Sequence, residues 1–131
     1  MNETDRGNAA PEGRTVEPNN DLDRIQRIIG EWGSRTFPQA TNDSIAAHLE
    51  DEAMELREVA GQQHEPLLRS EKYELAQEAA DCLLLLLHLA HRNGFSLFDA
   101  AAAKFAVNER RTWQAEPNDR GYMGHVETAV D

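Results

Sequence analysis

Residues 78–89 read EAADCLLLLLHL, an acidic pair followed by a nearly unbroken run of leucines. A helix that carries Leu83–Leu87 is apolar on every side, so it needs neighbours on every side. In a domain of 131 residues, we expect a second copy of the chain to supply some of these neighbours. The stretch therefore predicts an all-α bundle that is completed by homo-oligomerisation, as a homodimer or homotetramer.

Helical spacing of apolar residues extends the bundle on both sides of this segment. The central helix should run over residues 70–92, from a cap at Ser70 to the helix stop Asn93-Gly94. An earlier helix should begin near residue 21 and end at Gly33 and Ser34. Its apolar stripe consists of Ile25, Ile28, Ile29 and Trp32. The pattern places both helices in one bundle.

Two more helices complete the expected fold of four to five helices. One should begin at the polar residues 42–44 and close at residues 64–66, and the last should run from Ser96 to about Trp113. No strand pattern of useful length occurs in the sequence. We therefore expect one all-α domain over residues 21–126. Residues 1–20 should be a disordered tail, and residues 127–131 a short C-terminal tail.

Composition excludes several classes of function. The net charge is −11, which repels phosphate backbones and makes nucleic acid a poor partner. The longest apolar run is too short to span a membrane, and the N-terminus has no apolar core of a signal peptide. Cys82 is the only cysteine and is expected to be a buried thiol, which fits a reducing compartment. A cytoplasmic protein is therefore expected.

Two acidic motifs carry the expected chemistry. The first is Asp51-Glu52-Ala53-Met54-Glu55 and the second is Glu78-Ala79-Ala80-Asp81. Residues three apart share one face of a helix, so each motif points two carboxylates in one direction. Glu52 also falls inside the apolar arc of its helix, where an ionised group is costly unless it is paired. The alternatives are an ion pair with a neighbouring Arg or Lys, or a solvated acidic face.

If the two helices pack side by side, four carboxylates converge. Repulsion among them requires cations or protons, and Mg²⁺ is the leading candidate, with Mn²⁺ as its substitute. A basic edge on the last helix has the complementary charge, because Lys104, Asn108 and Arg111 have helical spacing. Such an edge suits phosphate oxygens, although it is also compatible with an ordinary solvated surface. No Glu-x-x-His pair occurs, so the di-iron bundle pattern is not met.

The arrangement resembles the MazG-like all-α nucleoside triphosphate pyrophosphohydrolases. Their acidic EExxE motif, spacer and ExxD motif correspond here to residues 51–55, a spacer over 56–77, and residues 78–81. The segments around Trp32, Phe37-Pro38 and His48, and the ending over 111–125, are similar to a branch linked to dATP and dGTP. Asp51 departs from the glutamate that the family often has.

The resemblance implies Mg²⁺-dependent hydrolysis of a nucleoside triphosphate, with dGTP or dATP expected, to the monophosphate and pyrophosphate. It implies nucleotide-pool control in a bacterium or a phage. The metal ligands would be Glu52, Glu55, Glu78 and Asp81, with Glu52 or Glu55 as the proton acceptor. Lys104, Asn108 and Arg111 would contact the phosphates, and Trp32, Phe37 or His48 the base. The alternatives are a non-catalytic helical interaction module, or an enzyme of the same fold that acts on dUTP or damaged nucleotides.

Overall fold

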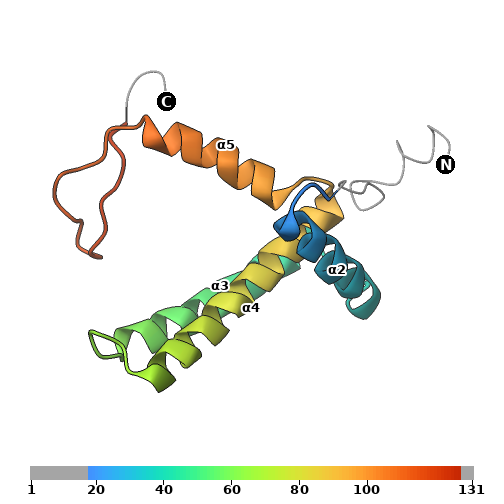
Figure 1. Cartoon of the computed structure of the whole chain (residues 1–131), viewed down its shortest axis with the longest axis horizontal. Coiled ribbons are helices and arrows are strands. Elements are labelled where there is room, and N and C mark those ends of the chain that lie inside the picture. Colours follow the sequence, from blue (N-terminus) through green and yellow to red (C-terminus); the bar gives the residue numbers. More distant parts are fainter. Residues whose placement is uncertain (1–17, 128–131) are drawn as a thin grey trace. The chain divides into compact units, whose positions relative to one another are not determined.

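The computed structural model describes residues 18–127 and has four helices in this part of the chain (Figure 1). They are α2 (Asp21–Thr36), α3 (Asn42–Gly61), α4 (Arg69–Asn93) and α5 (Leu97–Glu109). The all-α prediction is confirmed. The chain forms two compact units, one up to Phe98 and one from Asp99 onward, and each is described by itself. The predicted tail over residues 1–20 lies mostly outside the described residues, so its disorder stays a prediction.

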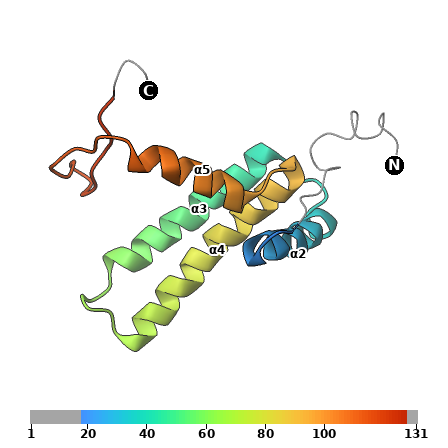
Figure 2. The same ribbon diagram turned by 45° about the horizontal axis from the view of Figure 1, so that its top comes forward.

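Helices α3 and α4 form a hairpin and lie side by side (Figure 2). Thr41 caps α3, because its hydroxyl accepts from the amide of Ser44 while Ser44 caps the Thr41 amide in return. At the other end of the hairpin, Glu71 holds the loop by accepting from the Leu68 amide at 2.9 Å. The prediction that Ser70 caps α4 is wrong, since α4 begins at Arg69 and Glu71 does the capping.

Helix α2 packs on the C-terminal half of α4 through glycines (Figure 2). A Cβ at Gly30 would lie 2.1 Å from Cγ of His91, and one at Gly33 would lie 2.9 Å from the ring of His88. Only glycine allows this approach. The prediction that α2 ends at Gly33 is therefore wrong. The helix continues to Thr36, and its glycines mark a close contact.

A polar network holds the α4–α5 connection against α2. The Gln26 amide donates to the carbonyl of Phe95 at 2.8 Å and accepts from the amide of Leu97 at 3.0 Å. Ser96 donates to the Asp23 carboxylate at 2.7 Å. Gln26 and Asp23 are buried, so these bonds satisfy polar groups that would otherwise be costly. The face of α2 that meets α4 is thus polar and glycine-rich.

The predicted apolar stripe of α2 remains largely uncovered within one chain. Ile28 is 64% exposed and Trp32 is 48% exposed. Leu83 and Leu84, in the leucine run of α4, are also exposed, whereas Leu87 is fully buried. Among the described residues the buried apolar core is small, and it consists of Ile45, Leu87 and Ala90. Cys82 is half-buried, not buried as expected.

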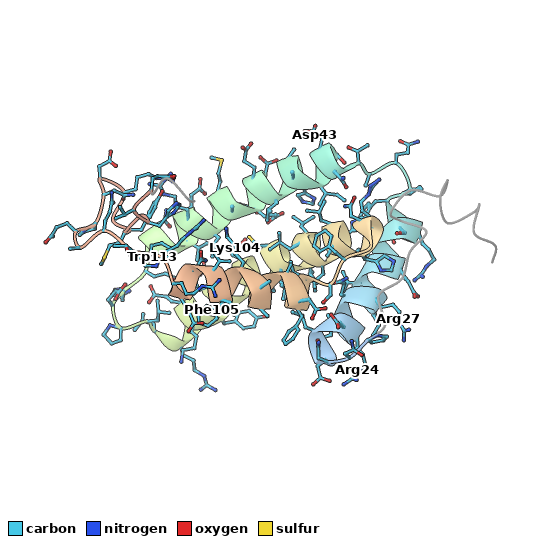
Figure 3. The ribbon with its side chains drawn as sticks, turned by 90° about the horizontal axis from the view of Figure 1, so that it is seen from above. Arg24, Arg27, Asp43, Lys104, Phe105 and Trp113 are labelled. Atoms are coloured by element: carbon cyan, nitrogen blue, oxygen red, sulfur yellow. The ribbon has the colours of Figure 1, made fainter. Side chains whose placement is uncertain are left out.

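The second unit contains most of α5 and the segment that follows. Figure 3 shows Lys104 and Phe105 on α5 and Trp113 beyond the end of the helix. The prediction that this helix reaches about Trp113 is wrong, because it ends at Glu109. The chain then turns back, and the Trp113 indole N–H donates to the carbonyl of Asn108 at 3.0 Å. Within residues 18–127, no helix is both long and apolar enough to cross a membrane.

Candidate functional site

Three of the predicted metal ligands come together between α3 and α4. Glu52 and Glu55 lie one turn apart on α3, and Glu78 lies on the facing part of α4. One carboxylate oxygen from each of the three lies within 4.8 Å of the others. The side-by-side packing of the hairpin creates this cluster, because it sets the two acidic motifs opposite each other.

Two oxygens of the cluster have no partner. Oε2 of Glu52 and Oε2 of Glu78 are shielded from solvent and accept no hydrogen bond from any residue between 18 and 127. The Glu52 side chain is only 18% exposed, and its one ionic partner in that range is His48, with Nε2 3.2 Å from Oε1. The alternative of an Arg or Lys partner for Glu52 is therefore not met there. Shielded carboxylate oxygens without donors are costly, and a divalent cation would satisfy them.

The electrostatics agree with this reading. The pKa of Glu55 is raised above its usual value, first by a carboxyl–carboxylate hydrogen bond with Glu52 and then by repulsion from Glu52. Burial raises the pKa of Glu78, and repulsion from Glu55 adds to it. Both shifts show that negative charge is unfavourable here without a cation. The ligand set therefore fits a hard divalent ion such as Mg²⁺ or Mn²⁺.

Asp81 lies beside the cluster but is not one of the three converging groups. Its charge contributes to the raised pKa values of Glu55 and Glu78, so it faces the same region. Its side chain is exposed in the single chain. It sits at the rim of a neighbouring cavity together with Glu52.

That cavity has a volume of about 680 Å³ and lies between α2, α3 and α4. Trp32, Phe37 and His48, the three residues predicted to contact a base, all line it. The rings of Trp32 and Phe37 meet edge to face, with centroids 5.4 Å apart. The wall is mostly apolar, and the carboxylates stand at one end. The space thus suits a flat, largely apolar group, with room for cations at the carboxylates.

The sequence interpretation did not identify His88 as a site residue. It lines the same cavity, and the centroid of its ring is 6.5 Å from that of Phe37. In the sequence it belonged to a polar stripe on the central helix that also fits a solvated face. The signal that could have found it is Gly33, because a glycine on the facing helix leaves room for a ring.

The predicted phosphate-binding residues lie in the second unit. Lys104 projects from α5 and is exposed (Figure 3). Arg111 lies beyond the end of α5, yet its guanidinium still donates to the Asn108 side chain at 3.2 Å. Its Nε is shielded from solvent and has no acceptor among residues 18–127. Within this unit, Asn108 and Arg111 are therefore neighbours, as predicted.

Comparison with known proteins gives a family. The family model described as dATP/dGTP pyrophosphohydrolase matches residues 25–131. A dATP/dGTP diphosphohydrolase of Salmonella phage PMBT28 is 36% identical over 69% of this chain, which spans only 27% of that protein. A dATP/dGTP diphosphohydrolase of cyanophage S-2L is 31% identical over 78% of this chain and 85% of its own length.

A solved structure agrees in fold. It is the cyanophage S-2L MazG-like pyrophosphohydrolase bound to dGDP and three catalytic Mn²⁺ ions per active site. It superposes with a TM-score of 0.61 at 28% identity, and the match covers 85% of this chain and 98% of that one. The predicted MazG-like resemblance is confirmed. The chain belongs to the dATP/dGTP pyrophosphohydrolase family.

Proposed function

We propose that the chain hydrolyses a purine deoxynucleoside triphosphate, dGTP or dATP, to the monophosphate and pyrophosphate in a Mg²⁺-dependent reaction. The observation that carries the proposal is the pair of orphaned carboxylate oxygens of Glu52 and Glu78, because Glu52 also lines an apolar cavity of about 680 Å³. Such a site binds cations at one end and a base at the other. The relatives named dATP/dGTP diphosphohydrolase support the same reaction class.

The metal ligands in this proposal are Glu52, Glu55 and Glu78, with Asp81 completing the set from the rim. Bound Mg²⁺ would neutralise the charge of the triphosphate and would lower the pKa of water at the site. Mn²⁺ is the expected substitute, and the S-2L structure holds that ion. Without cations the cluster would repel a triphosphate, because its own groups already repel one another.

The side chains have separate roles in the reaction. Trp32 and Phe37 provide the apolar wall for the base, and His48 fixes the orientation of Glu52 through their 3.2 Å contact. Glu52 or Glu55 accepts the proton of the attacking water, and the raised pKa of Glu55 suits that role. Lys104, Asn108 and Arg111 contact the phosphates and steady the leaving pyrophosphate.

We also propose that the active form is a homo-oligomer. Exposed apolar residues of α2 and α4, such as Ile25, Ile28 and Leu83, are costly to leave in water. A homodimer or homotetramer would cover them. The expected setting is the cytoplasm of a bacterium, with nucleotide-pool control by the host or by a phage as the biological role.

The direct test is turnover of dGTP, dATP, dCTP and dUTP with Mg²⁺ or Mn²⁺, with pyrophosphate and orthophosphate measured separately. We expect pyrophosphate and the monophosphate, with purines preferred. The matched pair is Glu52→Gln against Glu50→Gln, because Glu50 is an exposed residue of the same helix outside the cluster. Only Glu52→Gln should abolish turnover.

Other outcomes select the alternatives. Preferred turnover of dUTP, or of an oxidised nucleotide added as a further substrate, would keep the reaction and change the substrate. No pyrophosphate from any nucleotide with either ion would favour a non-catalytic interaction module.

A further inference from the structure

One buried polar group faces the cavity without a partner. His88 is 7% exposed and lines the cavity at its α2–α4 wall. No residue between 18 and 127 forms a hydrogen bond or an ion pair with its imidazole. The ring nitrogens are not among the shielded atoms of the described residues that lack a partner, so they remain open to solvent and to a ligand in the cavity.

Packing holds the ring in place without using its nitrogens. A Cβ at Gly33 would lie 2.9 Å from Cγ, Cδ2 and Nε2 of His88, so the ring is seated against bare backbone of α2. Phe37 stands on the cavity side at 6.5 Å between ring centroids. The position of the imidazole is therefore fixed before any ligand enters.

His91 provides an internal comparison. It is 8% exposed, lies one turn further along α4, and packs against Gly30 as His88 packs against Gly33. It does not line the cavity. If the histidines served only to fill the α2–α4 contact, the two positions would be equivalent. The two positions are not equivalent, because His88 also lines the cavity and lies beside the ring of Phe37.

We propose that His88 forms the hydrogen bond that reads the edge of the base, and is therefore a specificity-determining residue. The inference rests on the proposed function, because it takes the cavity as the base site. Apolar walls such as Trp32 and Phe37 bind any flat ring, but they cannot distinguish one base from another. A fixed polar group among them can.

The chemistry suits a purine. Burial lowers the pKa of His88, so the ring is neutral at pH 7 and offers one N–H donor and one acceptor nitrogen. Guanine presents O6 and N7 as acceptors, and adenine presents N7 beside an amino donor. Pyrimidines have no equivalent of N7. A donor from His88 to this edge would favour purines.

The test compares His88→Leu with His91→Leu. For each protein, kcat/KM is measured for dGTP and for three analogues that each lack one edge group: 7-deaza-dGTP, dITP and 2-aminopurine deoxyriboside triphosphate. In the wild type, the analogue that lacks the atom bound by His88 should be about tenfold poorer than dGTP, the scale of one neutral hydrogen bond. His88→Leu should abolish that penalty, and His91→Leu should preserve it.

A structural effect alone would give a different result. Both leucine variants should change the melting temperature, so stability does not separate them, whereas discrimination among analogues does. His88→Gln, which keeps a donor and an acceptor, should restore part of the penalty. If His88→Leu does not fold, the ¹⁵N shifts of the His88 ring in the wild type, with and without dGMP, decide the matter.

The outcomes separate this inference from the proposed function. The role of His88 would be overturned, while hydrolysis stood, by either of two results. One is an equal loss of kcat/KM for the analogues in the wild type and in His88→Leu, and the other is that dGMP leaves the ring ¹⁵N shifts unchanged. A wild type that hydrolyses no triphosphate would overturn the proposed function. In that case the dissociation constants of dGMP and its analogues would still test His88.

Discussion

The two halves of α4 meet their neighbours in opposite ways. The N-terminal half faces α3 with carboxylates, and two shielded oxygens there have no donor. The C-terminal half faces α2 with histidines that fit against glycines, with no room even for a methyl group at Gly30. One contact is close-packed, and the other is electrostatically incomplete.

The difference teaches how to distinguish a site from a packing contact. Close packing is stabilising without any further component, since it is satisfied by the chain itself. A buried set of like charges is not, and it persists because something outside the chain completes it. Polar residues lie at both ends of α4. Only their surroundings show which end is a packing contact and which is a site.

The largest effect is expected from a substitution in the carboxylate contact between α3 and α4. Glu78→Gln removes a ligand from α4, so turnover should fall on the order of a thousandfold, the scale of lost transition-state charge stabilisation. The matched control is Glu74→Gln, an exposed carboxylate one turn earlier on the same face of α4 and outside the three converging groups, which should keep turnover within about threefold. Pyrophosphate release measures both, and an active Glu78→Gln enzyme would remove this residue from the cation site.

The second prediction concerns a substitution that disrupts the close-packed contact between α2 and α4. Gly30→Ala places a methyl group 2.1 Å from Cγ of His91, which forces α2 away from α4 and should cost about 1–3 kcal/mol of unfolding free energy. Urea unfolding measures this cost. Gly61→Ala is the control, because its Cβ would meet nothing within 4 Å, and it should be neutral or slightly stabilising. Equal stabilities of the two variants would contradict the packing account.

The third prediction concerns the second unit. Lys104→Ala should raise the KM for the triphosphate by about tenfold, because it removes one charged phosphate contact, while nucleoside binding stays unchanged. Lys72→Ala, an exposed lysine of α4, should change neither value. Equal losses of triphosphate and nucleoside affinity on Lys104→Ala would argue against a phosphate role.

The smallest effect follows from the raised pKa values of Glu55 and Glu78. A pKa that is higher in the folded state gives stability that is complete below the usual value of 4.5 and is lost as the pH rises through the raised value. Without metal, the cluster should therefore lower the melting temperature as the pH rises from 4.5 to 7, and Mg²⁺ should restore a few degrees at pH 7.

Two buried histidines also change the dependence of the melting temperature on pH. Burial lowers the pKa of His88 and His91, so their contribution runs in the opposite sense and is lost as the pH falls below 6.5. The quantity to measure is thus the difference in melting temperature between the wild type and Glu55→Gln across this range. A difference that does not change with pH, with or without Mg²⁺, would show that the cluster is not under electrostatic stress.

Local chemistry made much of this molecule predictable. The four helices, the Gly94 stop and the cap region before α3 follow from residues close in sequence. The burial of Glu52 also follows, because helical periodicity alone places it in the apolar arc of α3. Trp32 and Phe37, which were predicted to contact a base, both line the cavity, and their contact with a base stays a prediction.

The parts that could not be predicted depend on contacts between helices. Gly33 looked like a helix end because glycine disfavours helices, but its close fit with His88 exists only once α2 meets α4. The polar network through Gln26, which holds the α4–α5 connection against α2, was not predicted either. The early end of α5 was also not predicted, and there the Trp113 indole N–H donates to the carbonyl of Asn108, five residues earlier.

The most direct test of the central claim is a crystal structure with Mn²⁺ and a non-hydrolysable dGTP analogue, with manganese located by anomalous scattering. We predict manganese ligated by oxygens of Glu52, Glu55 and Glu78, the groups now within 4.8 Å of one another, with the base in the adjoining cavity. Manganese bound elsewhere, with these three carboxylates turned apart toward solvent, would contradict the account.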